Sequence, residues 1–198
     1  MISPDGKNIA YLNNENGQWD LFLIPLEGGH SRRLTFTGIV SIFSWDSSKE
    51  IQFRACHESF HPRAGLIYKI DINSNEIKEV KIGPASGHLK KGSFELIARN
   101  LGDPAVWKRY KGGTAGTLWT KNNKSSKFKQ ILKSIKGNIA NPAIIEDRIF
   151  FISDHEGIGN IYSCTLTGKS IKRITNEKEY YERSFSFHND LISYQCAG

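Results

Sequence analysis

The sequence predicts an all-β fold made of β-propeller blades, each with four antiparallel strands, and three observations support this. Short runs rich in β-branched and aromatic residues alternate with clusters of Gly, Asn, Asp and Ser, as strands alternate with hairpin turns. The runs recur with a period of roughly 40 to 50 residues, which is typical of propeller repeats. No segment of about 12 or more residues has apolar residues at helical spacing. We therefore expect about four blades, an incomplete arc of a propeller, in a single domain over residues 1–198.

Each repeat unit supplies three strands of a blade. In chain order these strands are expected at residues 9–12, 20–26 and 32–35, then 51–55, 66–72 and 77–80, then 94–97, 117–120 and 128–132, and finally 148–153, 160–166 and 171–175. A fourth strand, the first of its blade, lies between these groups of three, at residues 40–45, 85–89, 139–145 and 183–187. The units thus span about residues 2–36, 37–81, 82–132 and 133–175, with a partial unit at 176–198.

Tight turns are expected between the first and second strands of a blade. The clearest is residues 3–6, Ser-Pro-Asp-Gly, in which Pro presets φ and Gly accepts a positive φ. Weaker versions occur at residues 45–48 and 188–190. The chain starts just before a second strand and ends within another, at residues 191–196. We therefore expect an arc cut from a longer protein.

The composition fits a folded chain with a basic surface. With 38% hydrophobic and 24% charged residues, the chain is too apolar for intrinsic disorder. The 27 Lys and Arg residues exceed the 20 Asp and Glu residues, which gives a formal net charge of +7. Because the lysines are scattered along the chain, we expect a solvated basic surface and no nucleic-acid partner.

The sequence also predicts a compartment. No uncharged apolar stretch approaches the roughly 20 residues that a bilayer requires, so no membrane partner is expected. The N-terminus has no cationic start followed by an apolar segment, which favours the cytoplasm. Cys56, Cys164 and Cys196 are odd in number and far apart, so they are expected to be buried thiols rather than a disulfide framework.

Several stretches resemble the first, six-bladed propeller of the archaeal tricorn proteases. The specific ones are residues 107–119 (WKRYKGGTAGTLW), 148–163 (RIFFISDHEGIGNIYS) and 179–183 (EYYER). The likeness continues more weakly through residues 82–85 and back to residues 3–6, so it covers almost the whole chain. The turn at residues 3–6 is less specific, because it also fits TolB-type and prolyl-oligopeptidase-type propellers.

The resemblance implies a function without catalysis in this segment. Tricorn proteases are large cytoplasmic serine peptidases that form homo-oligomers and degrade oligopeptides downstream of the proteasome. The resemblance implies that the parent protein of this chain is a hexamer. Their catalytic Ser, His and acidic residues lie in domains beyond both propellers, together with a PDZ module. The resemblance thus implies that this segment is a channel or filter for peptides and has no cofactor. Its expected partners are oligopeptides and the remaining propeller, PDZ and protease domains of the parent protein.

A propeller fold also serves two other functions. A free-standing TolB-like propeller that binds a protein partner is the alternative. A propeller glycosidase or sialidase would need converging acidic residues and an arginine cluster on one rim, and no such set occurs. The family also places paired arginines near this propeller to receive a peptide's carboxyl terminus. Arg32 and Arg33 are the sole Arg-Arg pair, but they lie on a predicted outermost strand, so the role is not transferred.

One cationic group is a candidate binding site. Lys108, Arg109 and Lys111 stand beside flexible glycines, where they are predicted to contact a peptide carboxylate. The same glycine-rich loop, residues 111–117, superficially resembles a phosphate-binding P-loop. A P-loop requires a Lys after its last Gly and a following helix, whereas a strand is expected here.

Three other groups of residues favour structural roles. Residues 56–61 (CHESFH) hold potential zinc ligands but lack a second ligand pair at zinc spacing, which predicts a loop between strands. Residues 153–156 (SDHE) contain the residue types of a catalytic triad, but contiguous hairpin residues do not normally converge, which predicts a polar turn. The four tryptophans are expected to pack between blades: Trp19, Trp45, Trp107 and Trp119.

Overall fold

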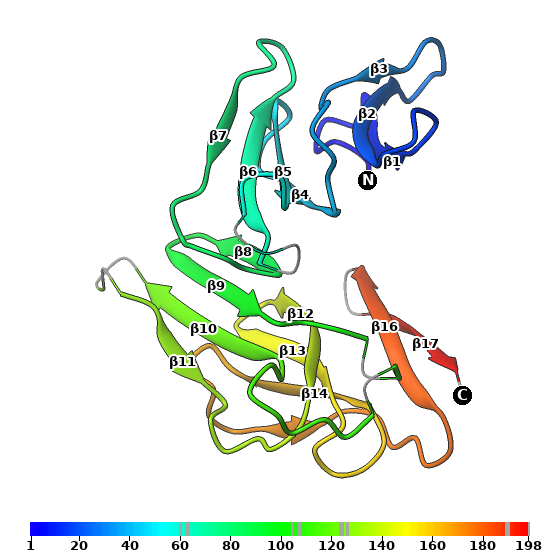
Figure 1. Cartoon of the computed structure of the whole chain (residues 1–198). Coiled ribbons are helices and arrows are strands. Elements are labelled where there is room, and N and C mark those ends of the chain that lie inside the picture. Colours follow the sequence, from blue (N-terminus) through cyan, green and yellow to red (C-terminus); the bar gives the residue numbers. More distant parts are fainter. Residues whose placement is uncertain are drawn as a thin grey trace. The chain divides into compact units, whose positions relative to one another are not determined.

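A computed structural model describes residues 1–59, 61, 64–103, 105–106, 108–122, 125, 127–188 and 191–197. All regular elements in these ranges are β-strands (Figure 1), which confirms the all-β prediction. They form one three-stranded, three four-stranded and one two-stranded antiparallel sheet. The chain divides into two compact units, Met1–His88 and Leu89–Gly198. The single domain expected over residues 1–198 stays a prediction.

The first unit contains two sheets. The three-stranded sheet is formed by β1 (Asn8–Asn13), β2 (Asp20–Pro25) and β3 (Arg32–Arg33). The four-stranded sheet is formed by β4 (Ser41–Trp45), β5 (Glu50–Ala55), β6 (Leu66–Asp71) and β7 (Ile77–Glu79). One hydrophobic core lies between them, with Ala10 and Leu21 from the first sheet and Phe53 and Ile70 from the second. This packing of sheet face on sheet face is how propeller blades bury their apolar surface.

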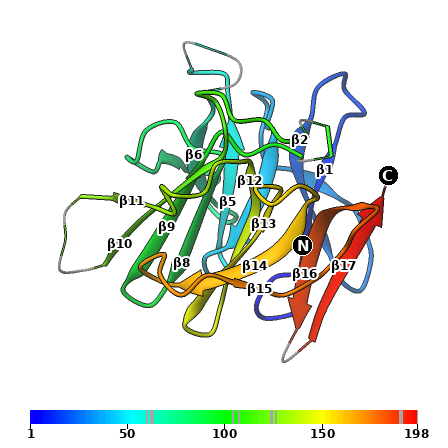
Figure 2. The same ribbon diagram turned by 90° about the horizontal axis from the view of Figure 1, so that it is seen from below.

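The chain enters the second unit within β8. The first sheet there has β8 (Gly87–Lys91), β9 (Phe94–Arg99), β10 (Thr117–Asn122) and β11 (Lys129–Ile131). The next has β12 (Ile139–Ile145), β13 (Arg148–Ser153), β14 (Asn160–Thr165) and β15 (Lys172–Arg173). A two-stranded sheet of β16 (Tyr181–His188) and β17 (Leu191–Ala197) lies beside it (Figure 2).

Two cores hold these three sheets together. The larger lies between the first two sheets and includes Leu96, Leu118, Phe151 and Tyr162. The smaller lies between the second sheet and the β16–β17 pair, and Ile152 and Ile161 are buried there with Phe185 and Ile192 packed against them. The second sheet of this unit is therefore covered by a neighbouring sheet on both of its faces.

The strand positions agree with those expected, with small shifts. The strand predicted at residues 85–89 begins at Gly87, because the Ala85 N–H donates to the Gly65 carbonyl instead of pairing with β9. The turn at residues 3–6 forms as expected, closed by the Gly6 N–H and the Ser3 carbonyl at 2.9 Å. Of the turn expected at residues 188–190, the last two residues lie outside the described ranges.

Two predictions about buried residues were wrong in part. Cys164 is buried as expected, but Cys56 is only partly buried and Cys196 is exposed. Trp45 packs against the first core, whereas Trp19 is 52% exposed. These three exceptions arise because the burial of a side chain in a turn or on an outer face of a sheet depends on which elements cover it and not on its type. Trp107 lies outside the described residues.

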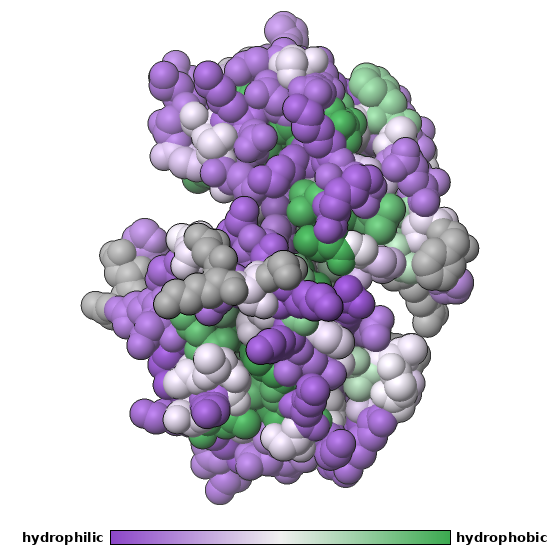
Figure 3. Space-filling model, turned by 90° about the vertical axis from the view of Figure 1, so that its left-hand side faces the viewer, coloured by the Kyte–Doolittle hydropathy of each residue, from purple (hydrophilic) through white to green (hydrophobic). Residues whose placement is uncertain are grey.

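One face of the molecule is drawn in a space-filling view. Figure 3 shows mainly hydrophilic residues on the face turned toward the viewer. None of the described residues forms a helix long and apolar enough to cross a membrane.

Candidate functional site

Three connections meet at one edge of the sheets in the second unit. They are the β9–β10 connection (residues 100–116), the β11–β12 connection (132–138) and the β13–β14 turn (154–159). Asp154, which is 2% exposed, joins them. Its carboxylate accepts the backbone N–H of Arg109 at 2.6 Å and that of Asn138 at 2.9 Å. The turn of one blade therefore fixes two loops that precede it in the chain.

The three predicted cations lie on the first of these loops, and all three are exposed. The Lys108 ammonium lies 5.1 Å from the centroid of the Tyr181 ring, at cation–π distance. Arg109 has a φ of 55°, a left-handed conformation that its N–H bond to Asp154 stabilises. Lys111 lines a pocket, and the other two cations do not. The structure thus places the three residues together on one loop, but only Lys111 belongs to the lining of a cavity.

The pocket has a volume of about 190 Å³ and lies between the β9–β10 and β11–β12 connections. Two of its lining residues, Lys133 and Lys136, were missed by sequence reasoning. The only signal for them was the short run of Lys, Ser, Ile, Lys and Gly at residues 133–137, which looks like any solvated turn. Three lysines therefore surround one cavity, and each of them is exposed.

Two glycines bring the pocket walls close together. A Cβ atom added to Gly116 would lie 2.1 Å from the carbonyl oxygen of Ile139. A Cβ atom added to Gly137 would lie 2.8 Å from the Cα of His155 and 2.9 Å from Asp154 Oδ1. Since such contacts involve backbone atoms that cannot move aside cheaply, these positions require glycine.

Ser153 and His155 come together, contrary to the expectation that contiguous residues of a hairpin do not converge. The Ser153 Oγ lies 3.0 Å from the His155 Nδ1. The reason is that residues two apart share one face of an extended chain. Ser153 is nonetheless 0% exposed, and Asp154 turns away to bind backbone N–H groups. The predicted polar turn is thus the structure that forms.

The His155 ring packs on an aromatic ring. Its centroid is 4.7 Å from that of Tyr162, and the Tyr162 hydroxyl donates to Glu156 Oε2 at 2.7 Å. Burial lowers the pKa of His155. Burial, followed by the hydrogen bond to Glu156, raises the pKa of Tyr162. His155 is therefore expected to stay neutral at physiological pH as a packing residue.

The predicted loop at residues 56–61 repeats this arrangement in the first unit. The rings of His57 and Tyr68 stack with centroids 5.3 Å apart, and the Tyr68 hydroxyl donates to Glu58 at 2.7 Å. The described residues contain no group of three or more His, Cys, Asp and Glu side chains placed to hold a metal ion. Phe60 of this loop lies outside the described ranges.

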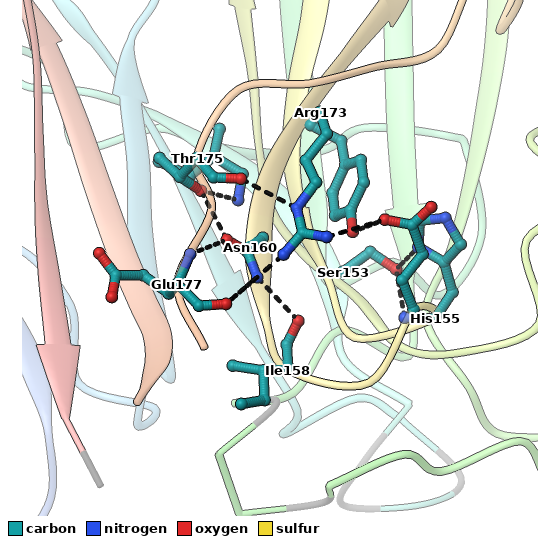
Figure 4. Close-up of polar contacts among 10 residues, drawn as sticks. Ser153, His155, Ile158, Asn160, Arg173, Thr175 and Glu177 are labelled. Carbon is teal, nitrogen blue, oxygen red and sulfur yellow. Dashed lines mark hydrogen bonds and ion pairs between the residues drawn. The ribbon is translucent and has the colours of Figure 1, made fainter. Parts of the chain in front are cut away.

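A polar network surrounds Asn160 at the start of β14 (Figure 4). Its Oδ1 accepts the Thr175 hydroxyl at 3.1 Å and the Glu177 N–H at 2.7 Å. Its Nδ2 donates to the carbonyls of Ile158 and Glu177. The guanidinium of Arg173 donates to the Thr175 carbonyl at 2.9 Å and lies 3.4 Å from Glu156. Because Asn160 is 0% exposed and uses both ends of its amide, the network is structural.

Glu182, near this network, is a buried carboxylate. It is 0% exposed, and no hydrogen bond of normal geometry from the described residues reaches either oxygen. Burial raises the pKa of Glu182. No sequence pattern marked it, since Glu in a strand is usually on the solvent face.

The chain matches proteins of known family along its full length. A family model described as the Tricorn protease N-terminal beta propeller domain matches residues 1–198. A Tricorn protease homolog of Saccharolobus solfataricus is 34% identical over 203 residues, which cover 100% of this chain and 19% of that protein. A Tricorn protease of Thermoplasma volcanium is 33% identical over 190 residues, covering 90% of this chain and 18% of that protein. The chain therefore spans less than a fifth of these relatives.

Solved structures give the same result. The crystal structure of the tricorn protease superposes with a TM-score of 0.84 at 26% identity, covering 98% of this chain and 20% of that chain. A putative TolB from Agrobacterium tumefaciens superposes with a TM-score of 0.64 at 19% identity over 87% of this chain and 62% of that one. The likeness to TolB shows the fold alone.

Proposed function

The chain belongs to the family of tricorn protease N-terminal beta-propeller domains, and on this premise we propose that it is a non-catalytic passage for oligopeptides in a tricorn-type serine peptidase. In this proposal the parent protein is cytoplasmic and degrades oligopeptides released by the proteasome. It is a homo-oligomer, a hexamer, and its remaining propeller, PDZ and protease domains supply the catalytic groups. The family match over residues 1–198 supports the assignment of the segment.

The observation that carries the passage role is the cationic β9–β10 connection. Lys108, Arg109 and Lys111 are exposed on a loop whose backbone is tied to Asp154. A fixed group of cations attracts the terminal carboxylate of a passing peptide before any contact is made. Exposed charges are screened beyond roughly 8 Å at physiological ionic strength, so the effect is one of steering rather than tight binding.

The test replaces all three residues with Gln in the purified peptidase and measures turnover of short acidic and neutral peptides. At low salt we expect turnover of acidic peptides to fall by about two- to tenfold, and the loss to fade at high salt. Neutral peptides should change less.

The matched control removes the same charge elsewhere in the second unit. Lys127, Lys169 and Lys172 are exposed there and lie away from the β9–β10 connection, and replacing them with Gln should leave turnover unchanged. An unchanged rate and salt dependence in the first variant, or equal losses in both variants, would contradict a steering role for this loop.

A further inference from the structure

The lysine pocket of the second unit has no assigned role, and its chemistry is that of an anion site. We propose that it binds a small oxyanion carrying two or more negative charges, as in a phosphate group or a di- or tricarboxylate. Lys111, Lys133 and Lys136 supply the positive charge. This inference goes beyond the passage of peptides and does not depend on it.

The charge around the cavity is uncompensated. The other lining residues are all uncharged: Gly112, Ala115, Gly116, Thr117, Gln130, Ile131, Leu132, Ile135, Gly137 and Ile139. Among the described residues, no carboxylate lies within ion-pair distance of any of the three lysines. The nearby Asp154 is buried and already accepts two backbone N–H groups. The lining of the pocket therefore contains three lysines and no acidic residue.

The charge and the volume together select the ligand class. A monovalent carboxylate would leave two of the three positive charges unbalanced, whereas a divalent or trivalent anion balances most of them. A volume of about 190 Å³ has room for several water molecules or for one small anion. That space fits a phosphate group or a compact polycarboxylate. Lysine also suits phosphate, because its ammonium acts as a point charge that needs no planar partner.

The pocket is already formed by the fold. Gly116 packs against the Ile139 carbonyl, and Gly137 packs against the β13–β14 turn, so the two walls are held at fixed positions. Asp154 binds the backbone on both sides, at Arg109 and Asn138. A ligand that enters a fixed site loses less free energy to ordering of the loops, which favours binding of a small anion.

The test measures binding of inorganic phosphate, citrate and acetate to the purified protein by calorimetry and by the shift in melting temperature. Sodium chloride at the same ionic strength is the reference. We expect phosphate or citrate to bind and to raise the melting temperature, with acetate at least about tenfold weaker because it carries one charge. The stronger of phosphate and citrate identifies the oxyanion.

The variants separate the pocket from general surface charge. Lys133→Gln with Lys136→Gln should weaken binding of the preferred anion by about tenfold, because two of the three lysine charges are lost and the solvent partly screens each of them. Lys127→Gln with Lys172→Gln removes the same charge outside the pocket and should leave binding within about twofold. Circular dichroism checks that both variants fold. Equal binding by the two double variants, or a melting shift no larger than that in sodium chloride, would overturn the proposal.

Discussion

Asp20 in the first unit and Asn160 in the second occupy the same place in their sheets. Each begins the strand that pairs with the outermost one, and each is almost fully buried. Asp20 Oδ1 accepts the Thr35 hydroxyl at 2.8 Å, and Asn160 Oδ1 accepts the Thr175 hydroxyl at 3.1 Å. The Thr35 hydroxyl oxygen accepts the N–H of Leu21, and the Thr175 hydroxyl oxygen accepts the N–H of Ile161, both at 2.9 Å. We call each of these polar groups a corner: Asp20 with Thr35 in the first unit, and Asn160 with Thr175 in the second. A side-chain oxygen at the start of the strand therefore organises the corner, whether or not that side chain is charged.

The charge decides where the neighbouring arginine goes. Arg33 donates to Asp20 Oδ2 at 2.5 Å, so the charge pair is internal to the corner. Arg173 has no carboxylate in the corner and instead lies 3.4 Å from Glu156, which is half exposed. The comparison teaches that one backbone arrangement accepts an ionic or a neutral corner, and that the substitution of Asp by Asn releases the arginine toward the surface.

The largest expected effect comes from removing the oxygen. Asn160→Leu leaves the Thr175 hydroxyl and the Glu177 N–H without their acceptor and should lower the free energy of unfolding by about 3 kcal/mol. Urea unfolding followed by circular dichroism measures it. Asn160→Asp, which recreates the Asp20 corner, should cost no more than about 1 kcal/mol. Equal stability of the two variants would show that the oxygen does not organise the corner.

A second difference lies just after each corner. The Ile39 N–H donates to Trp19 and the Glu182 N–H donates to Gly159, so a buried Ile and a buried Glu occupy matching positions. Glu182→Ile should raise the free energy of unfolding by about 2 kcal/mol at pH 7, because it removes a buried carboxylate that has no hydrogen bond of normal geometry.

The pH dependence of this gain has a definite sign. Burial raises the pKa of Glu182 in the folded state, so the folded state holds the proton more tightly than the unfolded one. The contribution of Glu182 to stability is therefore most favourable below its unfolded pKa of about 4.3 and is lost as the pH rises through the folded value. The gain from Glu182→Ile should shrink at pH 4. Glu179→Gln, at an exposed site, is the control and should show no such dependence. A gain that is the same at both pH values would count against a raised pKa.

The smallest effect concerns the charge of the first corner. Burial opposes ionisation of Asp20, but hydrogen bonds from Arg33, Thr35 and Gln18 outweigh it and lower its pKa. Its contribution is therefore present above the unfolded pKa of about 3.9 and is lost as the pH falls through the folded value. Asp20→Asn should cost about 1 to 2 kcal/mol at pH 7 and should remove part of the acid sensitivity. Unfolding curves at pH 3 and pH 7 measure both, and an unchanged acid slope would mean that the pair with Arg33 does not lower the pKa.

Much of the fold could be predicted from the sequence, whereas little of the site could. The strands, their order and the repeat followed from apolar alternation and from turn residues, which are properties of neighbouring residues. The resemblance to tricorn propellers followed from contiguous stretches such as residues 148–163. Lys108, Arg109 and Lys111 were found because they are adjacent. Lys133 and Lys136 were missed because they join Lys111 only through packing of two connections.

The sequence by itself determined the all-β class, the strands and the family, because each rests on local patterns along the chain. Only the tertiary structure decided that Asp154 binds two distant loops and that Glu182 is buried away from solvent. Whether a polar side chain is buried, paired or free depends on which other blade covers it. The strands of each blade pair with strands that are close in the sequence. The surroundings of a loop, however, are set by sheets that are tens of residues away, and no short sequence pattern shows which sheet that is.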